Sequence, residues 1–403
     1  MKLPIPITVL TGFLGSGKTT LLKALLEHPD MAGTAVIVNE FGEVGLDDAL
    51  IEGAEEDIIL LPSGCVCCAV RGDLVEALNR LYDRMGSSKH NGSGNQNTGG
   101  PIPEITRIVL ETSGLADPAP IAHTLMTEED LFRIYQLDGV VTTVDAELGL
   151  AQIEEHFEPA KQIAVADRIV LTKTDRAGVD AIIAIKARIH ALNPTAELRQ
   201  VTMGETSPDL VTGLAAFEPV AAKAHAEGWL GAEAYGHDDS GKGEHDQVAR
   251  HDCASGDCDH PGHKNLNGFA QGPHRFSSEH GHSHYHGNDH GHSHGIRSFS
   301  LTFDEPIDGQ KLSFAIELLR TMHGEKLLRV KGIAAVEGEP LPFVIHGVQH
   351  IFYPPTTLDK WPSDDRRSRF VFITKDLDKV AVESVFGPIF SNAPVPPGAF
   401  SSD

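Results

Sequence analysis

Basic residues, aromatic residues and long apolar runs are all scarce in this chain of 403 residues. Lysine and arginine number 33 against 57 acidic residues, which gives a formal net charge of −24. This charge argues against nucleic acid or an anionic membrane surface as the main partner, because both need a basic face. No run approaches the ~18 apolar residues of a membrane-spanning helix. The start, MKLPIPITVLTGFLGSGK, has prolines and glycines where a signal peptide needs its apolar segment, so we expect a cytoplasmic protein.

Cysteine is also rare, yet three of the five cysteines stand within four positions. Cys65, Cys67 and Cys68 form a C-x-C-C cluster, and adjacent cysteines cannot readily pair with each other. In a reducing compartment such clusters are more often metal ligands or redox centres than disulfide partners. Three thiolates suit Zn²⁺ or another late transition metal, with a fourth position for Glu40, a histidine, water or a recipient protein. Inert buried cysteines and a redox cluster stay open as alternatives.

The N-terminal half of the chain alternates β-rich segments with helical patterns. Several segments are continuous runs of Val, Ile and Leu, as in strands that helices cover on both faces. Repeated strand–helix units predict an α/β fold with a doubly wound, mostly parallel sheet, whose ligands bind beyond the carboxyl ends of the strands. We expect strands at 5–10, 34–39, 58–61, 107–112, 139–145, 168–173 and 197–202, and helices at 19–27, 72–85, 118–126 and 178–191.

A glycine-rich motif follows the first expected strand and opens the first expected helix. GFLGSGKT, Gly12 to Thr19, matches G-x-x-x-x-G-K-[ST], the P-loop pattern. Its glycines let backbone N–H groups converge on phosphate oxygens, Lys18 reaches the β- and γ-phosphates, and Thr19 holds Mg²⁺. The helix start adds partial positive charge. The predicted phosphate-binding residues are Gly12, Gly15, Ser16, Gly17, Lys18, Thr19 and Thr20.

The segment LTKTD, 171–175, ends a later strand and is the candidate for reading the base. Asp175 can accept the N1–H and the exocyclic amino protons of guanine, whereas adenine offers no N1–H. The stem of Lys173 would lie along the base. Thr172 stands where the usual GTPase element has Asn, which weakens the match. With the P-loop, the segment favours GTP over ATP.

Two acidic loops are candidates for the metal side of the nucleotide site. LETSG, 110–114, ends an apolar strand, so Glu111 would act near Mg²⁺ through water and Gly114 near the γ-phosphate. We therefore name Lys18, Glu111 and Gly114 as the catalytic set. VNEFGEVGLD, 38–47, is placed as a nucleotide-sensing loop, with Glu40 and Glu43 as candidates for metal or for the second shell of Mg²⁺.

A second potential metal site lies in a histidine-rich stretch, which holds thirteen of the 22 histidines. Closely spaced imidazoles can share Zn²⁺, Co²⁺ or Ni²⁺ among many weak arrangements, and two cysteines could make a tighter pocket. The alternative is a solvated linker with incidental histidines. The candidate ligands are Cys253, Cys258, His260, His263, His280, His282, His284, His286, His290, His292 and His294.

Composition predicts the domain boundaries. The P-loop domain should span 1–220, with a Gly/Ser/Asn-rich mobile insertion at 86–103, and a disordered, histidine-rich linker should follow at 231–295. A small α+β domain with a mostly antiparallel sheet is expected at 296–390, and a flexible tail at 391–403. Within the small domain we expect strands at 296–306, 327–336, 342–353 and 368–376 and a helix at 309–322.

The chain closely resembles the CobW branch of the CobW/HypB/UreG family of metal-handling GTPases. The resemblance is carried by five motifs, which occur in the order GFLGSGKTT, NEFGEVGLD, GCVCC, ETSGLADP and TKTD. The resemblance covers residues 5–215 and 296–390. It implies slow GTP hydrolysis, metal binding at the three clustered cysteines and delivery of that metal to client proteins. It leaves the metal open, because relatives are linked to zinc, to cobalt in cobalamin synthesis and to metallation of nitrile hydratase.

The sequence thus predicts a GTP-dependent metal chaperone that uses GTP, Mg²⁺ and Zn²⁺, with Co²⁺ or another divalent metal as the alternative to zinc. Its partner would be a client metalloprotein, and a homo-oligomer stays open. The alternatives are a cobalt chaperone of cobalamin biosynthesis or a metallation factor, a metal storage protein with a vestigial nucleotide fold, and a redox regulator.

Overall fold

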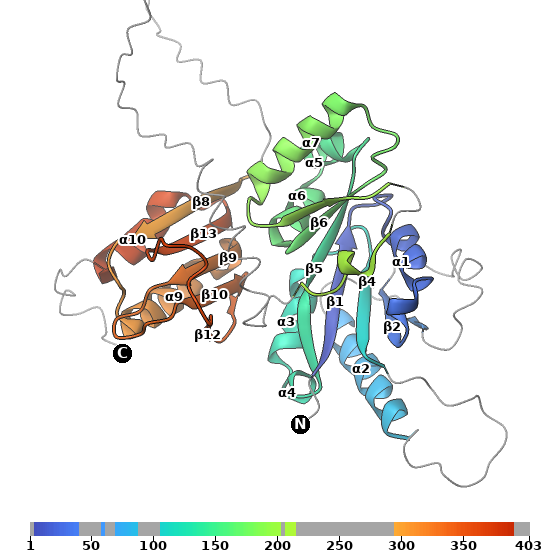
Figure 1. Ribbon diagram of the computed structural model, residues 1–403, viewed down its shortest axis with the longest axis horizontal. Helices are drawn as coiled ribbons and strands as arrows, with labels where there is room; N and C mark the ends of the chain where they lie inside the picture. The colour runs from blue at the N-terminus through green and yellow to red at the C-terminus, as the bar shows by residue number, and fades with distance from the viewer. Residues whose placement is uncertain are drawn as a thin grey trace, which may run out of the picture. The chain divides into compact units, whose positions relative to one another are not determined.

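The computed structural model describes residues 4–39, 58–60, 69–87, 105–202, 206–214 and 294–390. All of these belong to one compact unit of the chain, Met1–Gly236 with His292–Asp403. They form two sheets with their own helices (Figure 1). The first sheet carries the P-loop motif, and the second belongs to the C-terminal part of the chain.

The first sheet has seven strands in the order β3-β2-β4-β1-β5-β6-β7, and every ladder is parallel. β1 therefore lies in the middle, between β4 and β5 (Figure 1). This order confirms the predicted doubly wound α/β fold. The strands are β1 (Ile5–Gly12), β2 (Thr34–Asn39), β3 (Ile58–Leu60), β4 (Arg107–Thr112), β5 (Tyr135–Asp145), β6 (Arg168–Thr172) and β7 (Glu197–Gln200).

Helices cover both faces of this sheet, as the apolar runs require. In β1, Ile7 and Val9 pack in one core cluster with α2 and α3, whereas Leu10 packs in another with α1. Successive side chains of a strand point to opposite faces, so the two clusters lie on opposite sides of the sheet. The helices are α1 (Lys18–Leu26), α2 (Ala69–Ser87), α3 (Ala119–Thr127), α4 (Glu129–Phe132), α5 (Gly149–Glu155), α6 (Phe157–Val165) and α7 (Val179–Leu192).

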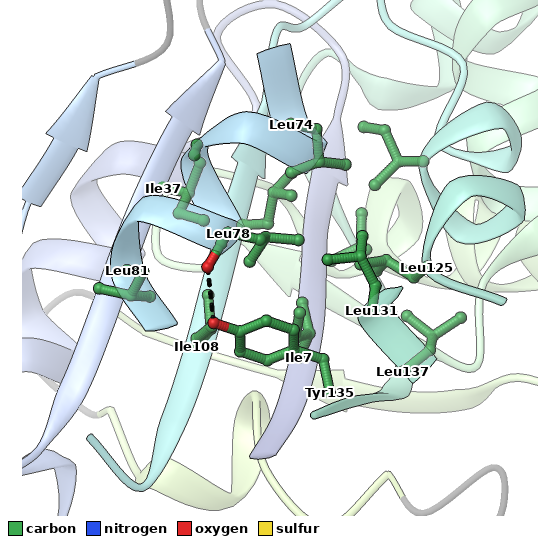
Figure 2. Packing of buried hydrophobic residues seen from close by; sticks show 14 of the residues in the cluster. Ile7, Ile37, Leu74, Leu78, Leu81, Ile108, Leu125, Leu131, Tyr135 and Leu137 are labelled. Carbon is green, nitrogen blue, oxygen red and sulfur yellow. Dashed lines mark hydrogen bonds between the residues drawn. The ribbon is translucent and has the colours of Figure 1, made fainter. Parts of the chain in front are cut away.

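A buried tyrosine at the start of β5 fixes α2 on the sheet. The hydroxyl of Tyr135 donates a hydrogen bond of 2.8 Å to the carbonyl of Leu78 in α2 (Figure 2). Burial raises the pKa of Tyr135 well above its ordinary value, so the hydroxyl keeps the proton it donates. Leu74, Leu78 and Leu81 fall on one face of α2 and are buried, as their spacing predicts.

The second sheet is antiparallel in the order β11-β10-β9-β13-β8, with β12 paired to β10. Two helices, α9 (Gly309–His323) and α10 (Lys379–Phe390), accompany it. The rings of Phe370, Phe372 and Phe386 meet in its core. The strands are β8 (Ile296–Phe303), β9 (Leu327–Ala334), β10 (Phe343–Val348), β11 (Ile351–Phe352), β12 (Thr356–Thr357) and β13 (Ser368–Lys375).

The structure corrects several expected elements. The segment 342–353 is a hairpin rather than one strand, because Gln349 adopts a left-handed φ of 52° and turns the chain. The sequence did not reveal α4, α5, α6 or α10: α4 and α5 have only four and seven residues, and α10 contains a Gly-Pro pair. Helix α2 runs to Ser87, so the predicted insertion at 86–103 begins inside a helix. The rest of that insertion, 231–293 of the predicted linker, and the tail 391–403 lie outside the described residues.

A buried ionic cluster joins the two sheets. Asp167, in the turn between α6 and β6, pairs with Arg329 and Lys331 of β9, and its carboxylate also accepts the Val140 N–H at 3.1 Å. Burial raises the pKa of the Asp167 carboxyl, but Arg329, Lys331, His346 and the Val140 N–H together outweigh it and hold that pKa well below its ordinary range. Apolar side chains close the junction, since Ile163 of α6 shares a cluster with Leu328 and Ile373.

We predict that Asp167→Ala destabilises the protein strongly, because it removes the carboxylate that pairs with the buried Arg329 and Lys331. Breaking a buried pair in this way costs about 3–5 kcal/mol of unfolding free energy. Urea denaturation measures it. The control is Glu317→Ala, which removes the exposed partner of Arg320 on α9 and should cost less than about 1 kcal/mol. Equal losses in the two variants would contradict this account of the junction.

Candidate nucleotide-binding site

The P-loop leaves β1 through a glycine that no other residue can replace. Gly12 has φ +144°, and a Cβ there would lie 2.3 Å from the Thr143 Oγ1 and 2.5 Å from the Thr143 carbonyl oxygen. Gly15 and Gly17 are also left-handed, with φ of 72° and 94°. The loop thus packs tightly against Thr143 near the end of β5, at a place where only glycine fits.

Lys18 and Ser16 hold the loop closed from within. The Lys18 ammonium donates to the Gly12 carbonyl at 2.9 Å and to the Phe13 carbonyl at 3.3 Å, and the side chain is buried. The Ser16 hydroxyl lies 2.7 Å from that of Thr143 on β5. The lysine predicted to bind phosphate therefore lies folded across the loop that precedes it. Thr20 is exposed on the first turn of α1.

The two residues predicted to bind Mg²⁺ are in direct contact. The Thr19 hydroxyl donates to the Glu111 carboxylate at 2.6 Å. β1 and β4 are parallel neighbours with Leu10 opposite Glu111, so the P-loop and the end of β4 begin at the same level of the sheet. Glu111 is buried. A hydroxyl and a carboxylate are hard oxygen ligands, which fits Mg²⁺ at this place.

The loop after β4 lies directly against the P-loop. A Cβ at Gly114 would come within 2.6 Å of Leu14 Cδ2 and 2.8 Å of the Leu14 backbone nitrogen. Behind the loop, the side-chain amide of Gln162 in α6 donates to the Gly114 and Ala116 carbonyls at 3.1 and 3.0 Å. The structure thus brings the predicted Gly114 to the P-loop and adds Gln162, which no sequence motif indicated.

The end of β6 is tied to the P-loop by two side chains. The Lys173 ammonium donates to the Gly15 carbonyl and to Asp145 Oδ2, both at 2.7 Å. The Thr172 hydroxyl donates to the Ser16 carbonyl at 2.7 Å, so this departure from the usual Asn still anchors the strand end to the loop. Asp175 is exposed beyond them.

Asp145 is a site residue that the sequence analysis missed. It ends β5 and is 1% exposed. One carboxylate oxygen accepts the Glu147 and Leu148 N–H groups at 2.8 and 3.1 Å, and the other accepts Lys173. An acidic residue at the end of the apolar run 139–145 was the available signal, but only the tertiary structure shows which cation it holds.

The cysteine cluster and its candidate fourth ligand lie outside the described residues. The residues in question are Cys65, Cys67, Cys68 and Glu40, and Glu43 of the same acidic loop lies outside the described residues as well. The elements on either side are described: β3 ends at Leu60 and α2 begins at Ala69. Leu60 pairs with Val38, Val38 with Glu111, and Glu111 with Leu10, so the four residues form one row across the sheet.

Of the second predicted metal set, only His294 is among the described residues. One nitrogen of its ring lies 2.9 Å from the Ile153 carbonyl in α5, and the ring packs edge-on against Phe157 of α6. His294 thus joins the start of the C-terminal sheet to α5 and α6. Outside the description lie Cys253, Cys258, His260, His263, His280, His282, His284, His286, His290 and His292.

The described residues contain neither a cluster of potential metal ligands nor a membrane-spanning helix. Within these ranges no three or more His, Cys, Asp or Glu side chains gather in a way that could hold a metal ion. In the same part of the chain, no helix is long and apolar enough to cross a membrane.

Comparison with known proteins supplies the context for this geometry. The family described as "CobW/HypB/UreG, nucleotide-binding domain" matches residues 6–200, and the "Cobalamin synthesis protein cobW C-terminal domain" matches 296–388. The zinc chaperone YjiA of Escherichia coli is 31% identical over 95% of this chain and 98% of its own length. The zinc chaperone CobW of Pseudomonas aeruginosa is 28% identical over 94% of this chain and 89% of its own.

Solved structures agree with these matches. The zinc-bound YjiA GTPase from E. coli has a TM-score of 0.62 and 27% identity, covering 96% of this chain and 99% of that one. A zinc-bound triple mutant of YjiA, in which one glutamate and two cysteines are replaced by alanine, has a TM-score of 0.63 with the same identity and coverage. With both domains matched and a relative aligned over nearly its whole length, the chain belongs to the CobW/HypB/UreG family.

Proposed function

We propose that this protein is a GTP-dependent zinc chaperone, which binds and hydrolyses GTP with Mg²⁺ at the P-loop and passes zinc from the C-x-C-C cluster to a client metalloprotein. The observation that carries the nucleotide half of the proposal is the contact between Thr19 and Glu111. It puts a hydroxyl and a carboxylate together beside the P-loop, at the carboxyl edge where parallel sheets bind ligands. On sequence grounds we place the protein in the cytoplasm.

The P-loop supplies charge and donors for the phosphates. Bound GTP would take the Lys18 ammonium away from the Gly12 and Phe13 carbonyls, and the backbone N–H groups of the loop would bind phosphate oxygens. Mg²⁺ between Thr19 and Glu111 would offset the charge that develops during phosphoryl transfer. We expect the Gly114 backbone N–H to bind the γ-phosphate, because the loop that carries it packs on Leu14 of the P-loop.

Guanine recognition rests on Lys173 and Asp175. Asp145 and the Gly15 carbonyl hold Lys173 in one place, so its stem offers a fixed surface for the base. Asp175 follows two residues later and is exposed, which leaves its carboxylate available to accept the two guanine donors. ATP has no matching pair of donors.

The metal half of the proposal rests on the cysteines and on the relatives. YjiA and CobW are named zinc chaperones, and thiolates are ligands that zinc prefers. YjiA is also zinc-bound as a mutant lacking one glutamate and two cysteines, so zinc can occupy that protein without those side chains. To decide which residues of the present chain bind zinc, the affinity for zinc and the number of zinc ions bound must therefore both be measured.

Sheet topology favours coupling between the metal and the nucleotide. The cysteine segment leaves β3 at Leu60, in one row with Val38, Glu111 and Leu10. Three strand spacings separate β3 from β1, which amounts to roughly 14 Å. Metal bound within the segment 61–68 would thus act on the same edge of the sheet as Mg²⁺ and the γ-phosphate.

A metal storage protein is the candidate of a different class. The cysteines and the histidine-rich linker at 231–295 could bind metal in a storage protein as well as in a chaperone. The linker would raise the local metal concentration in both. Turnover separates the two, because a storage protein need not hydrolyse GTP. The direct contact of Thr19 with Glu111 favours the GTPase.

Lys18→Ala should lower GTP turnover by at least about 100-fold, since losing one group that stabilises the developing charge costs that much in comparable sites. Phosphate release at saturating GTP measures it. Lys23→Ala, further along α1, is the matched control and should keep the wild-type rate. Hydrolysis at the wild-type rate by Lys18→Ala would contradict the P-loop assignment.

Asp175→Asn should weaken GTP binding by at least about tenfold, because hydrogen bonds to a charged acceptor are worth roughly 1.5–3 kcal/mol. The same change should favour xanthosine triphosphate, whose O2 accepts the new amide donor. Competition binding with both nucleotides tests this, and Asp180→Asn, an exposed acid on α7, serves as the control. If the Asp175 variant binds GTP normally, another residue reads the base.

Changing Cys65, Cys67 and Cys68 together to Ser should abolish tight zinc binding and the response of GTP hydrolysis to zinc, while GTP still binds. Deleting 237–291 should instead lower the number of zinc ions bound and keep the tight site. This deletion leaves His294 and its contact with Ile153 in place. Equilibrium dialysis and GTPase rates at matched free zinc measure both. The opposite pattern would mean that the two metal sites are assigned the wrong way round.

A further inference from the structure

Helix α6 (Phe157–Val165) lies between the loop after β4 and the second sheet. Its consecutive residues Lys161 and Gln162 contact the loop, whereas Ile163 and Val165 belong to the cluster that includes Leu328 of β9. The loop after β4 therefore depends for its support on a helix that is itself held by the C-terminal domain.

Gln162 is unusual for a buried amide. It is fully buried, and its nitrogen donates to two carbonyls of the same loop, those of Gly114 and Ala116. Both partners are acceptors, so the nitrogen must face them. The side-chain oxygen is buried and accepts a hydrogen bond from none of the described residues. An unpaired buried acceptor costs about 1–3 kcal/mol, so stability alone explains this arrangement poorly.

The loop is confined from both sides. In front, Gly114 approaches Leu14 of the P-loop so closely that a Cβ would not fit. Behind, Gln162 holds the Gly114 carbonyl, and Lys161 pairs with Asp117 at 2.6 Å. Because the P-loop is fixed on the end of β5, the position of Gly114 relative to a γ-phosphate follows from the contacts behind it.

We propose that Gln162 is a positioning residue for GTP hydrolysis, which acts through the Gly114 carbonyl to set the Gly114 N–H against the γ-phosphate. The inference rests on the proposed GTPase function. In hydrolysis a water oxygen forms a bond to the γ-phosphorus while the bond from that phosphorus to the bridging oxygen breaks. GDP leaves with the electron pair, and the water gives up a proton to the phosphate or to solvent. Gln162 touches none of the reacting atoms.

Replacing Gln162 with Met keeps the length of the side chain and removes its donors. We expect the kcat for GTP to fall by tenfold to a hundredfold, since a misplacement of about 1 Å costs a rate of that order. The affinity for GDP, which lacks the γ-phosphate, should stay within about threefold of wild type. Lys161→Met should act in the same direction with a smaller effect, and its part-exposed position makes it a second test if Gln162→Met does not fold.

Asn193→Leu is the matched control. Asn193 is also a buried amide, but it donates to the Ile163 and Ala166 carbonyls at the C-terminal end of α6 rather than to the loop after β4. It should lower the melting temperature as much as Gln162→Met but keep kcat within about threefold of wild type. An unchanged kcat in Gln162→Met, an equal loss of kcat in Asn193→Leu, or a parallel loss of GDP affinity would overturn the inference. A wild-type protein that binds GTP without hydrolysing it would overturn the proposed function as well.

Discussion

The parallel pairing of β1 with β4 and β5 is the constraint on which the candidate site depends. It puts the end of β1 between two strand ends at the same level, so the P-loop is bordered by Glu111 on one side and by Thr143 on the other. The close approach at Gly12 follows from this, because the chain must turn over the end of β5 without a side chain in the way. Every predicted nucleotide contact among the described residues lies along this edge.

The same edge gives a physical reason for a GTPase to handle metal. β3 and β2 continue the row that contains Glu111, and the chain leaves both strands toward the segments with Cys65, Cys67, Cys68 and Glu40. A metal ion bound there would bring charge close to Mg²⁺ and GTP. Charges roughly 14 Å apart are largely screened where solvent lies between them, since the Debye length is about 8 Å at physiological ionic strength, but they are screened much less through the protein interior. Metal and nucleotide can then influence each other's binding.

On the other side of the site, helix α6 relates the nucleotide loop to the C-terminal domain. Gln162 holds the loop, Ile163 packs into the shared core, and Asp167 follows the helix with its buried pairs to β9. Burial makes this junction costly to break, so the two domains should move together. A change at the γ-phosphate could thereby reach the surface of the second sheet.

The sequence allowed much of the fold to be predicted, because its strands are apolar runs and its motifs stand at strand ends. Glu111 and Thr19 are 92 residues apart, yet their motifs alone placed both at Mg²⁺. Asp145 and Gln162 were missed because their roles depend on contacts across the fold, and Gln162 lies in a helix that the sequence did not reveal. Thr172 looked like a weak match, but its hydroxyl still ties β6 to the P-loop.

The most direct test of the account is the zinc affinity of the protein in its two nucleotide states, measured by competition with a chelator in the presence of GDP or of a non-hydrolysable GTP analogue. Coupling between two sites typically changes affinity by 5- to 150-fold and is reciprocal, so zinc must shift the relative affinity for the two nucleotides by the same factor. We predict a difference of at least about fivefold in both directions. Equal zinc affinity with GDP and with the analogue would contradict a GTP-dependent chaperone and favour a metal store.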